Sequence, residues 1–142
     1  MKFSKTIVYK LHQIVYTLDV QANLILLTNF EICYEDFMVL NLIYNYPEIN
    51  QQEIALTLRQ SKSAISQKIS KLEEKNFLKR HASKHSRREN KLKLTKQGIG
   101  IFQQASEILD KTSAVVFKSL KDHQLFQTEL DTIIKTLNEI YN

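Results

Sequence analysis

The feature that most restricts the fold of this chain is a basic block, Lys79–Thr95, with the sequence KRHASKHSRRENKLKLT. Its seventeen residues include seven lysines and arginines and two histidines, while Glu89 is its only acid. Blocks of like charge repel one another, so they are either disordered or held ready for an anionic partner. Apolar residues lie at both ends of the block: Phe77–Leu78 precede it, and the alternating Leu92 and Leu94 lie near its end. Two apolar segments that flank a polar stretch predict a β-hairpin, which would attach the charged residues to a folded domain.

Most of the remaining chain is predicted to be helical. Two glycines and one proline in 142 residues are far below ordinary usage of about 7% and about 5%, which disfavours long irregular loops. The length suits one domain, residues 1–142, and a 43% hydrophobic content is enough for a core. We therefore expect a mainly α fold with one small β element.

The single cysteine and the start of the chain indicate a cellular location. Cys33 has no second cysteine for an internal disulfide, and no secretory signal follows Met1, so we expect a reducing, cytoplasmic location. The longest apolar run, Leu24–Leu27, is far too short for a bilayer span, so no membrane partner is expected.

The positive charge is concentrated in the middle of the chain. Residues 59–96 carry thirteen lysines and arginines against three acids, a balance of +10, whereas the rest of the chain has a balance of −5. Phosphate contacts supply most non-specific affinity for nucleic acid, and a basic face is their usual footprint. A solvated basic surface is the alternative, and the local pattern has to decide between them.

Three helices are predicted ahead of the basic region. Apolar residues at spacings of three and four indicate a long helix over Lys5–Phe30, and a second helix over Glu35–Asn45 ends before Pro47. Asn50 and Glu53 have the spacing of a capping box, which predicts the start of a third helix.

The segment SKSAISQKISKLEEKNF predicts a fourth helix with two different faces. Ser61 is a suitable N-cap, and Asn76 stands where a left-handed C-terminal residue is wanted. One stripe of this helix is apolar: Ile65, Ile69 and Leu72. The opposite stripe is small, polar and cationic: Ser63, Gln67, Ser70, Lys71 and Glu74. Such a face can lie in a major groove, where Gln, Lys and Ser read base edges.

The elements after this helix predict a wing. We expect a strand over Phe77–Arg80, a loop over Ala82–Asn90, a second strand over Lys91–Leu94, and a helix starting at Thr95. Two helices joined by a tight turn and followed by a basic two-stranded hairpin form a winged helix-turn-helix. Its basic tip would reach the minor groove or the phosphates beside the recognition helix.

Two strings, LRQSKSAISQKISKLEEKNFLKR and RRENKLKLTKQG, resemble the signature of MarR-family transcriptional regulators. The matching features are a serine-rich recognition helix ending in Leu-Glu-x-Lys and an Arg-rich wing closing on Leu-Thr-x-x-Gly. The chain departs from the family at Asn76, which replaces the usual glycine, and at Ser83 and Ser86, where aspartates often stand. The resemblance implies a homodimeric winged-helix protein that binds a pseudo-palindromic operator in double-stranded DNA, usually as a repressor released by a small molecule or by oxidation.

Carried onto this sequence, the resemblance makes residues 61–71 the major-groove helix. Ser63, Ser66 and Gln67 would read bases, Lys62, Lys68 and Lys71 would mostly hold phosphates, and Arg87 or Arg88 would enter the minor groove. The complete set of expected DNA-binding residues is Ser61, Lys62, Ser63, Ala64, Ser66, Gln67, Lys68, Lys71, His85, Arg87 and Arg88.

The two ends of the chain are expected to dimerise. Residues 1–30 and 100–142 carry more apolar helix than a small winged helix at residues 34–96 needs for its own core. With the resemblance, this surplus favours a two-fold homodimer that spans two half-sites.

Cys33 and five tyrosines suggest two further roles, redox sensing and binding of an effector. Cys33 precedes the second helix, whose amides could lower its thiol pKa and make it a redox sensor, although a buried bystander is the commoner case. Five tyrosines could line an effector cleft or could be ordinary half-buried core residues: Tyr9, Tyr16, Tyr34, Tyr44 and Tyr46.

Catalysis is not expected. Gly98-Ile99-Gly100 lacks the surroundings of a phosphate loop, and no nucleophile motif occurs. His81 and His85 are interpreted as wing residues instead of metal ligands, and no cofactor is expected. A winged helix that binds RNA or a protein remains the alternative to DNA binding.

Overall fold

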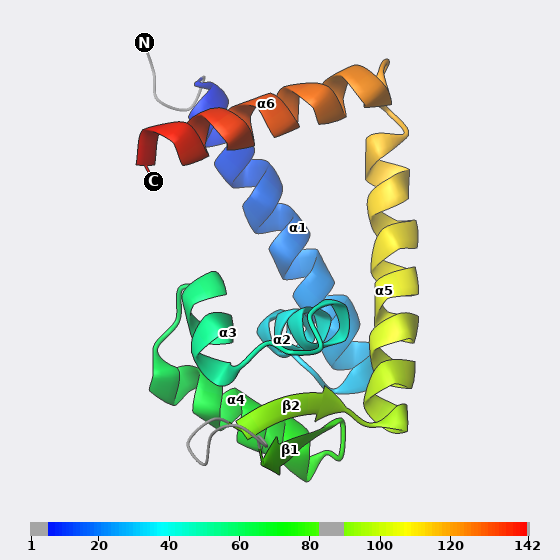
Figure 1. Ribbon diagram of the computed structural model, residues 1–142. Helices are drawn as coiled ribbons and strands as arrows, with labels where there is room; N and C mark the ends of the chain where they lie inside the picture. Colours follow the sequence, from blue (N-terminus) through cyan, green and yellow to red (C-terminus); the bar gives the residue numbers. More distant parts are fainter. Residues whose placement is uncertain (1–5, 83–89, 142) are drawn as a thin grey trace. The chain divides into compact units, whose positions relative to one another are not determined.

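The computed structural model describes residues 6–82 and 90–141 (Figure 1). Within these ranges the chain forms six helices and one two-stranded antiparallel sheet. Their order is α1 (Ile7–Phe30), α2 (Tyr34–Asn45), α3 (Gln51–Thr57), α4 (Lys62–Glu74), β1 (Leu78–Ala82), β2 (Asn90–Leu94), α5 (Lys96–Phe117) and α6 (His123–Tyr141). The predicted mainly α winged helix-turn-helix is confirmed.

The chain divides into two compact units, Met1–Leu109 and Asp110–Asn142. The division falls inside α5, nine residues after the expected start of the C-terminal dimerisation region at residue 100. The first unit contains α1 to α4, the sheet and the beginning of α5; the second contains the end of α5 and α6.

The predicted helix ends of the first unit are confirmed by their hydrogen bonds. The amide of Glu53 donates to Asn50 Oδ1 at 2.9 Å and the amide of Asn50 donates to Glu53 Oε2 at 2.8 Å, which completes the capping box of α3. Ser61 Oγ accepts from the Ala64 amide at 3.1 Å and caps α4. Asn76 has φ 58°, and the Phe77 amide donates back to the Leu72 carbonyl at 2.9 Å. These bonds form a Schellman turn, which turns the chain from α4 into the wing.

The core of the first unit is built around α2. Five apolar residues of this helix are buried: Phe37, Val39, Leu40, Leu42 and Ile43. They join buried side chains from α1, α3, α4, the sheet and α5 in one hydrophobic cluster. The ring of Phe37 stacks on that of Phe102 with centroids 5.5 Å apart, which attaches the first half of α5 to α2.

The wing is a short hairpin whose inner side completes this core. Leu78 pairs with Leu94 and Arg80 pairs with Leu92, and Leu78 and Leu92 are almost fully buried. Ala82 pairs with Asn90, so both strands are longer than expected and both ends of the expected loop at 82–90 belong to the ladder. An additional bridge joins Asn50 to Lys91, so the segment before α3 lies against β2.

The start of α5 fits tightly against the start of the wing. Thr95 Oγ1 accepts from the Gly98 amide at 3.0 Å and donates to the Asn76 carbonyl at 2.6 Å, so Thr95 caps α5 as predicted and ties it to the turn after α4. A Cβ placed on Gly98 would lie 1.8 Å from the Phe77 carbonyl oxygen. Only glycine can occupy this position without moving the backbone.

The second unit exposes much of its apolar surface. Asp122 Oδ1 accepts from the Leu125 amide at 2.8 Å at the start of α6, and the rings of Phe117 and Phe126 lie 6.3 Å apart. None of the α6 side chains is buried. Its exposed large apolar residues are Leu125, Ile133, Ile134, Leu137, Ile140 and Tyr141.

Candidate nucleic-acid interface

Helix α4 presents a polar face because its opposite face is completely buried. Ile65, Ile69 and Leu72 have no exposed surface, and they fix the helix against the core. On the other side Ser61, Lys62, Ser63 and Gln67 are exposed, while Ala64 and Ser66 are half-buried. The expected base readers Ser63 and Gln67 therefore lie on the accessible side of one rigid helix.

The turn before α4 sets the direction in which this face points. Arg59 adopts a left-handed conformation with φ 52°, and the Gln60 amide donates to the Ala55 carbonyl at 2.9 Å. The side chain of Gln51 donates to the Lys62 carbonyl at 3.4 Å, and Lys62 Nζ donates to Gln52 Oε1 at 3.4 Å. These contacts join the starts of α3 and α4 into a helix-turn-helix.

Two expected phosphate contacts of α4 are held by acids of α2. Lys68 Nζ lies 2.5 Å from Glu35 Oε2, and Lys71 Nζ lies 2.8 Å from Asp36 Oδ2. The hydrogen bond to Glu35 raises the pKa of Lys68, and the hydrogen bond to Asp36 raises the pKa of Lys71. Both ammonium groups are thus charged and already paired.

Asp36 is the buried end of this arrangement. Its carboxylate is 1% exposed and accepts hydrogen bonds from Lys71 Nζ and, at 3.2 Å, from the Cys33 amide. Burial alone would raise the pKa of Asp36, but the hydrogen bonds from Lys71 and Cys33 outweigh it and leave that pKa below its usual value. The charged carboxylate therefore caps α2 and anchors α4 at the same time.

Cys33 is the N-cap residue of α2. Its Sγ accepts from the Asp36 amide at 3.4 Å, which makes a capping box of Cys33 and Asp36. Burial raises the pKa of the Cys33 thiol, because desolvation outweighs the hydrogen bond from that amide. The helix amide does lower the thiol pKa, but burial outweighs it, so the thiolate that a redox sensor needs is disfavoured.

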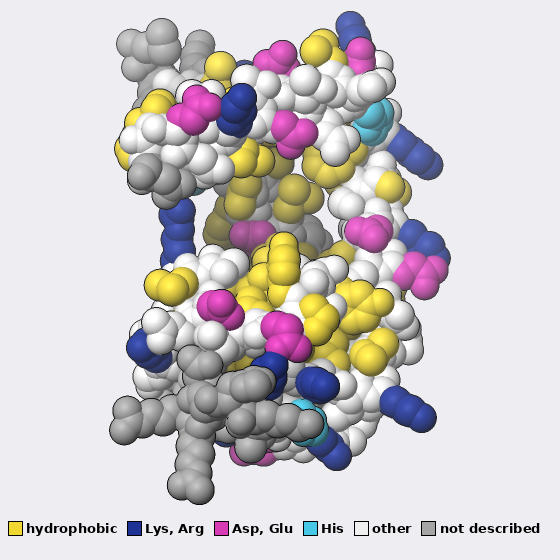
Figure 2. Space-filling view, viewed as in Figure 1, with side chains coloured by type: hydrophobic (Ala, Val, Ile, Leu, Met, Phe, Trp, Pro, Cys, Tyr) yellow, Lys and Arg dark blue, Asp and Glu magenta, His cyan; other side chains and the backbone are white. Residues whose placement is uncertain are grey.

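The base of the wing is fastened to α4. Arg80 Nη2 donates to Ser70 Oγ at 3.1 Å, and the Arg80 amide donates to Glu73 Oε1 at 3.2 Å. On the neighbouring strand Lys91 pairs with Glu48. Lys and Arg side chains gather over this part of the molecule, at the lower end of Figure 2. The hydrogen bonds of Arg80 thus join the first strand of the wing directly to α4.

The expected contacts of the wing tip lie outside the described residues. This applies to His85, Arg87 and Arg88, and to the two serines at family aspartate positions, Ser83 and Ser86. Their roles stay predictions.

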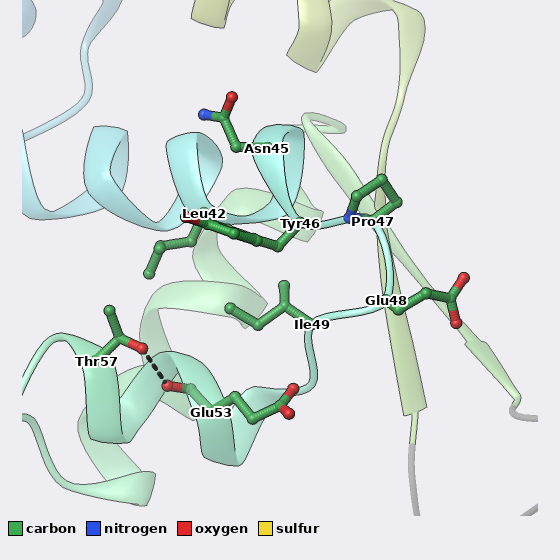
Figure 3. A pocket seen from close by; sticks show the side chains of 8 residues that line it. All are labelled: Leu42, Asn45, Tyr46, Pro47, Glu48, Ile49, Glu53 and Thr57. Carbon is green, nitrogen blue, oxygen red and sulfur yellow. Dashed lines mark hydrogen bonds between the residues drawn. The ribbon is translucent and has the colours of Figure 1, made fainter.

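A groove lies between the end of α2 and α3. It has a volume of about 670 Å³. In Figure 3 the side chains of Tyr46 and Ile49 border the same space, whereas Glu48 points away from it. Its lining is completed by Leu42, Asn45, Pro47, Glu53 and Thr57. Tyr46 is the residue of the five predicted cleft tyrosines that lines this groove.

The described residues contain neither a metal-binding cluster nor a helix suited to a membrane. No cluster of three metal-binding side chains occurs in residues 6–82 and 90–141. In the same ranges no helix combines the length and apolar character that a bilayer span requires.

Comparison with protein families decides which winged helix this is. The model of the MarR family matches residues 33–90, which include α2, the helix-turn-helix and the first strand of the wing. The winged helix of this chain is therefore similar to that of the MarR family. The resemblance predicted from the recognition helix and the Leu-Thr-x-x-Gly motif is confirmed.

Solved structures of MarR-family regulators match nearly the whole chain. MepR of S. aureus, solved in a complex with DNA, has 22% sequence identity and a TM-score of 0.79, with 98% of this chain and 99% of that chain covered. BldR of Sulfolobus solfataricus has 19% identity and a TM-score of 0.81, covering 96% and 99%. A MarR/EmrR family regulator of Acinetobacter sp. ADP1 has 16% identity and a TM-score of 0.82, covering 98% and 96%. At these identities the likeness concerns the fold. A comparison with curated protein sequences found no significant match.

The interactions that position the winged helix include residues that the sequence did not single out. Glu35, Asp36 and Arg80 hold α4 and the wing, yet none was among the expected site residues. One signal was present, since Asp36 follows Cys33 at the spacing of a capping box. Cysteine is not a usual N-cap, so this pattern was not recognised.

Proposed function

We propose that this protein is a sequence-specific regulator of transcription that binds double-stranded DNA. The observation that carries the proposal is the polar face of α4, where Ser61, Lys62, Ser63 and Gln67 are exposed while the opposite face is locked in the core. A helix of this kind fits the major groove, and its short side chains allow close approach to base edges. The DNA complex of MepR, a protein with the same fold, supports this use of the helix.

We assign base reading and phosphate contact to different residues. Gln67 can form two hydrogen bonds with one adenine, and Ser63 and Ser66 can reach base edges beside it. Lys62, in the first turn of α4, would hold a phosphate, and Arg87 or Arg88 would enter the minor groove from the wing. The balance of +10 over residues 59–96 supplies the attraction for the duplex.

We infer that the active form is a homodimer. Helix α1 exposes a long series of apolar residues, including Ile7, Val8, Ile14, Val15 and Leu24, and α6 exposes a second series. Exposed apolar surface of this extent is typical of association sites. A two-fold dimer would present two copies of α4 to half-sites about 34–36 Å apart.

A repressor released by a small molecule is the form of regulation we propose. Occupation of an operator is sufficient to block transcription, so the DNA-binding surface alone can perform this role. The groove beside Tyr46 and Ile49, with a volume of about 670 Å³, has the size of ligand sites in proteins, which is about 300–1,000 Å³.

The test begins with selection of duplex fragments from genomic DNA by the purified protein at physiological salt. The selected fragments are then titrated with the wild type and with two variants, Gln67→Ala and Lys62→Ala. Gln67→Ala is expected to change the order of preference among fragments, whereas Lys62→Ala is expected to weaken all fragments alike and to reduce the salt slope by about one. Single-stranded RNA serves as competitor. No enrichment of any fragment, or stronger binding to the RNA, would refute the proposal.

A further inference from the structure

Two lysines of α4 and its C-cap residue Lys75 are held by the first turn of α2 and by Glu31, the C-cap residue of α1. Lys68 Nζ lies 2.5 Å from Glu35 Oε2, Lys71 Nζ lies 2.8 Å from Asp36 Oδ2, and Lys75 Nζ donates to the Glu31 carbonyl at 2.8 Å. The spacing of these lysines by three and four residues puts them on the same edge of the helix. The charges of Lys68 and Lys71 are therefore neutralised within the chain.

The three contacts differ in the exposure of the partner group and in whether that group is charged. Asp36 is 1% exposed and also caps α2, so its contact with Lys71 is part of the core. The partner of Lys75 at 2.8 Å is a backbone carbonyl. The Glu31 carboxylate lies 3.9 Å from Lys75 Nζ and is 89% exposed, so it makes only a loose ion pair. Glu35 is 56% exposed and lies within hydrogen-bond distance of Lys68, which is 20% exposed, so this pair combines a close contact between charges with access to solvent.

Lys68 is also the lysine that directly follows Gln67, an exposed residue at the middle of the polar face. When a helix lies in the major groove, the two phosphate backbones border it, and a lysine at the edge of its inserted face can reach one of them. A phosphate that binds Lys68 competes with Glu35 for the positive charge of the ammonium group. Whether Glu35 is displaced or stays bound, its carboxylate would lie close to the anionic backbone.

We propose that Glu35 is an affinity-determining residue of the DNA-binding surface, which withholds Lys68 from the phosphates and so weakens binding to DNA of every sequence. The inference rests on the proposed function, because it concerns the same surface. Phosphate contacts carry no sequence information, so weakening them increases the share of affinity that comes from base readers such as Gln67. The hydrogen bond that raises the pKa of Lys68 agrees with this pairing.

The experiment is a double-mutant cycle on residues 35 and 68, read by fluorescence anisotropy with the selected duplex and with an unrelated duplex. Glu35→Gln, Lys68→Gln and the double variant are compared with the wild type at several salt concentrations. Glu74→Gln is the matched control, because Glu74 is an exposed acid on α4 to which the described residues offer no ion pair. Circular dichroism and thermal unfolding of each variant establish that it is folded.

Glu35→Gln is expected to tighten binding of both duplexes by about two- to fivefold, the range of an exposed ion pair, and to steepen the salt slope by about one phosphate contact. Lys68→Gln is expected to change affinity less than about twofold in the wild type and to abolish the gain in the Glu35→Gln background. In the Glu74→Gln background, Lys68→Gln should change the affinity by the same small factor as it does in the wild type.

Three results would overturn the inference. An equal cost of Lys68→Gln in all backgrounds would show that Glu35 does not withhold this lysine. Equal gains from Glu35→Gln and Glu74→Gln, with no dependence on Lys68, would reduce the effect to net charge. Failure of the wild type to bind either duplex would refute the proposed function itself, and with it this inference.

Discussion

Replacement of Gly98 by alanine tests how tightly the wing and α5 are joined. The added Cβ would lie 1.8 Å from the carbonyl oxygen of Phe77 and 2.7 Å from its carbonyl carbon. Both are backbone atoms, and the same oxygen accepts the Thr95 amide at 3.0 Å. The clash cannot be relieved by rotation of a side chain. Either α5 or the start of β1 has to move.

The expected magnitude follows from two opposing terms. Alanine is a better helix former than glycine by about 1 kcal/mol, while overpacking of a well-packed site costs about 1–3 kcal/mol and more when backbone has to shift. Because the backbone has to shift, we take the upper end of that cost and expect Gly98→Ala to lower the free energy of unfolding by about 2 kcal/mol. Gly100→Ala is the matched control, because nothing lies within 4 Å of its added Cβ. It should raise the free energy of unfolding by up to about 1 kcal/mol.

Urea denaturation followed by circular dichroism measures both variants. The protomer concentration has to be the same in all samples, since association would add to the apparent stability. The expected order is Gly100→Ala, wild type, Gly98→Ala, with about 3 kcal/mol between the extremes. Equal stability of the two variants would refute the packing of Gly98 against Phe77.

Three further predictions concern the cap of α2 and the dimer. Asp36→Asn should lower stability by about 1–3 kcal/mol at neutral pH. Because folding lowers the pKa of Asp36, the stability that its carboxylate contributes is present above the ordinary pKa of aspartate, about 4, and is lost as pH falls through the folded pKa. Wild type and variant should therefore converge in stability when urea titrations are repeated at acid pH. A stability difference that stays constant with pH would contradict the role of the charged Asp36 carboxylate. Iodoacetamide should label Cys33 more slowly than free cysteine at pH 7, because burial raises the pKa of its thiol; faster labelling would revive the redox hypothesis. Ile134→Glu puts a charge on the apolar face of α6 and should shift the protein to monomer in analytical ultracentrifugation. Thr132→Glu, on the other side of the helix, should leave it dimeric. If both variants are dimeric, α6 is not part of the interface.

Local hydrogen bonding explains which parts of the fold could be predicted. The caps at Asn50 and Ser61 and the left-handed Asn76 depend on bonds within a few residues, so the types of those residues were sufficient to predict them. The wing was predictable because the alternation of Leu92 and Leu94 records which side of the strand is buried.

The interactions that position α4 depend on contacts far apart in the sequence. Lys68 and Glu35 are separated by 33 residues, and Lys71 and Asp36 by 35. The helical period correctly put Lys71 on the polar side of α4, but it contains no information about an acid supplied by α2. The charge of these lysines was therefore assigned to DNA phosphates, while the structure pairs it within the chain.

The most direct test of the central claim is a hydroxyl-radical footprint of the protein on its best selected duplex, repeated at increasing salt. We expect two protected half-sites on one face of the duplex, with centres about 34–36 Å apart, and protection that fades steeply as salt rises. Uniform protection along the duplex, or none at low salt, would contradict the claim that α4 and the wing form a sequence-specific DNA-binding surface.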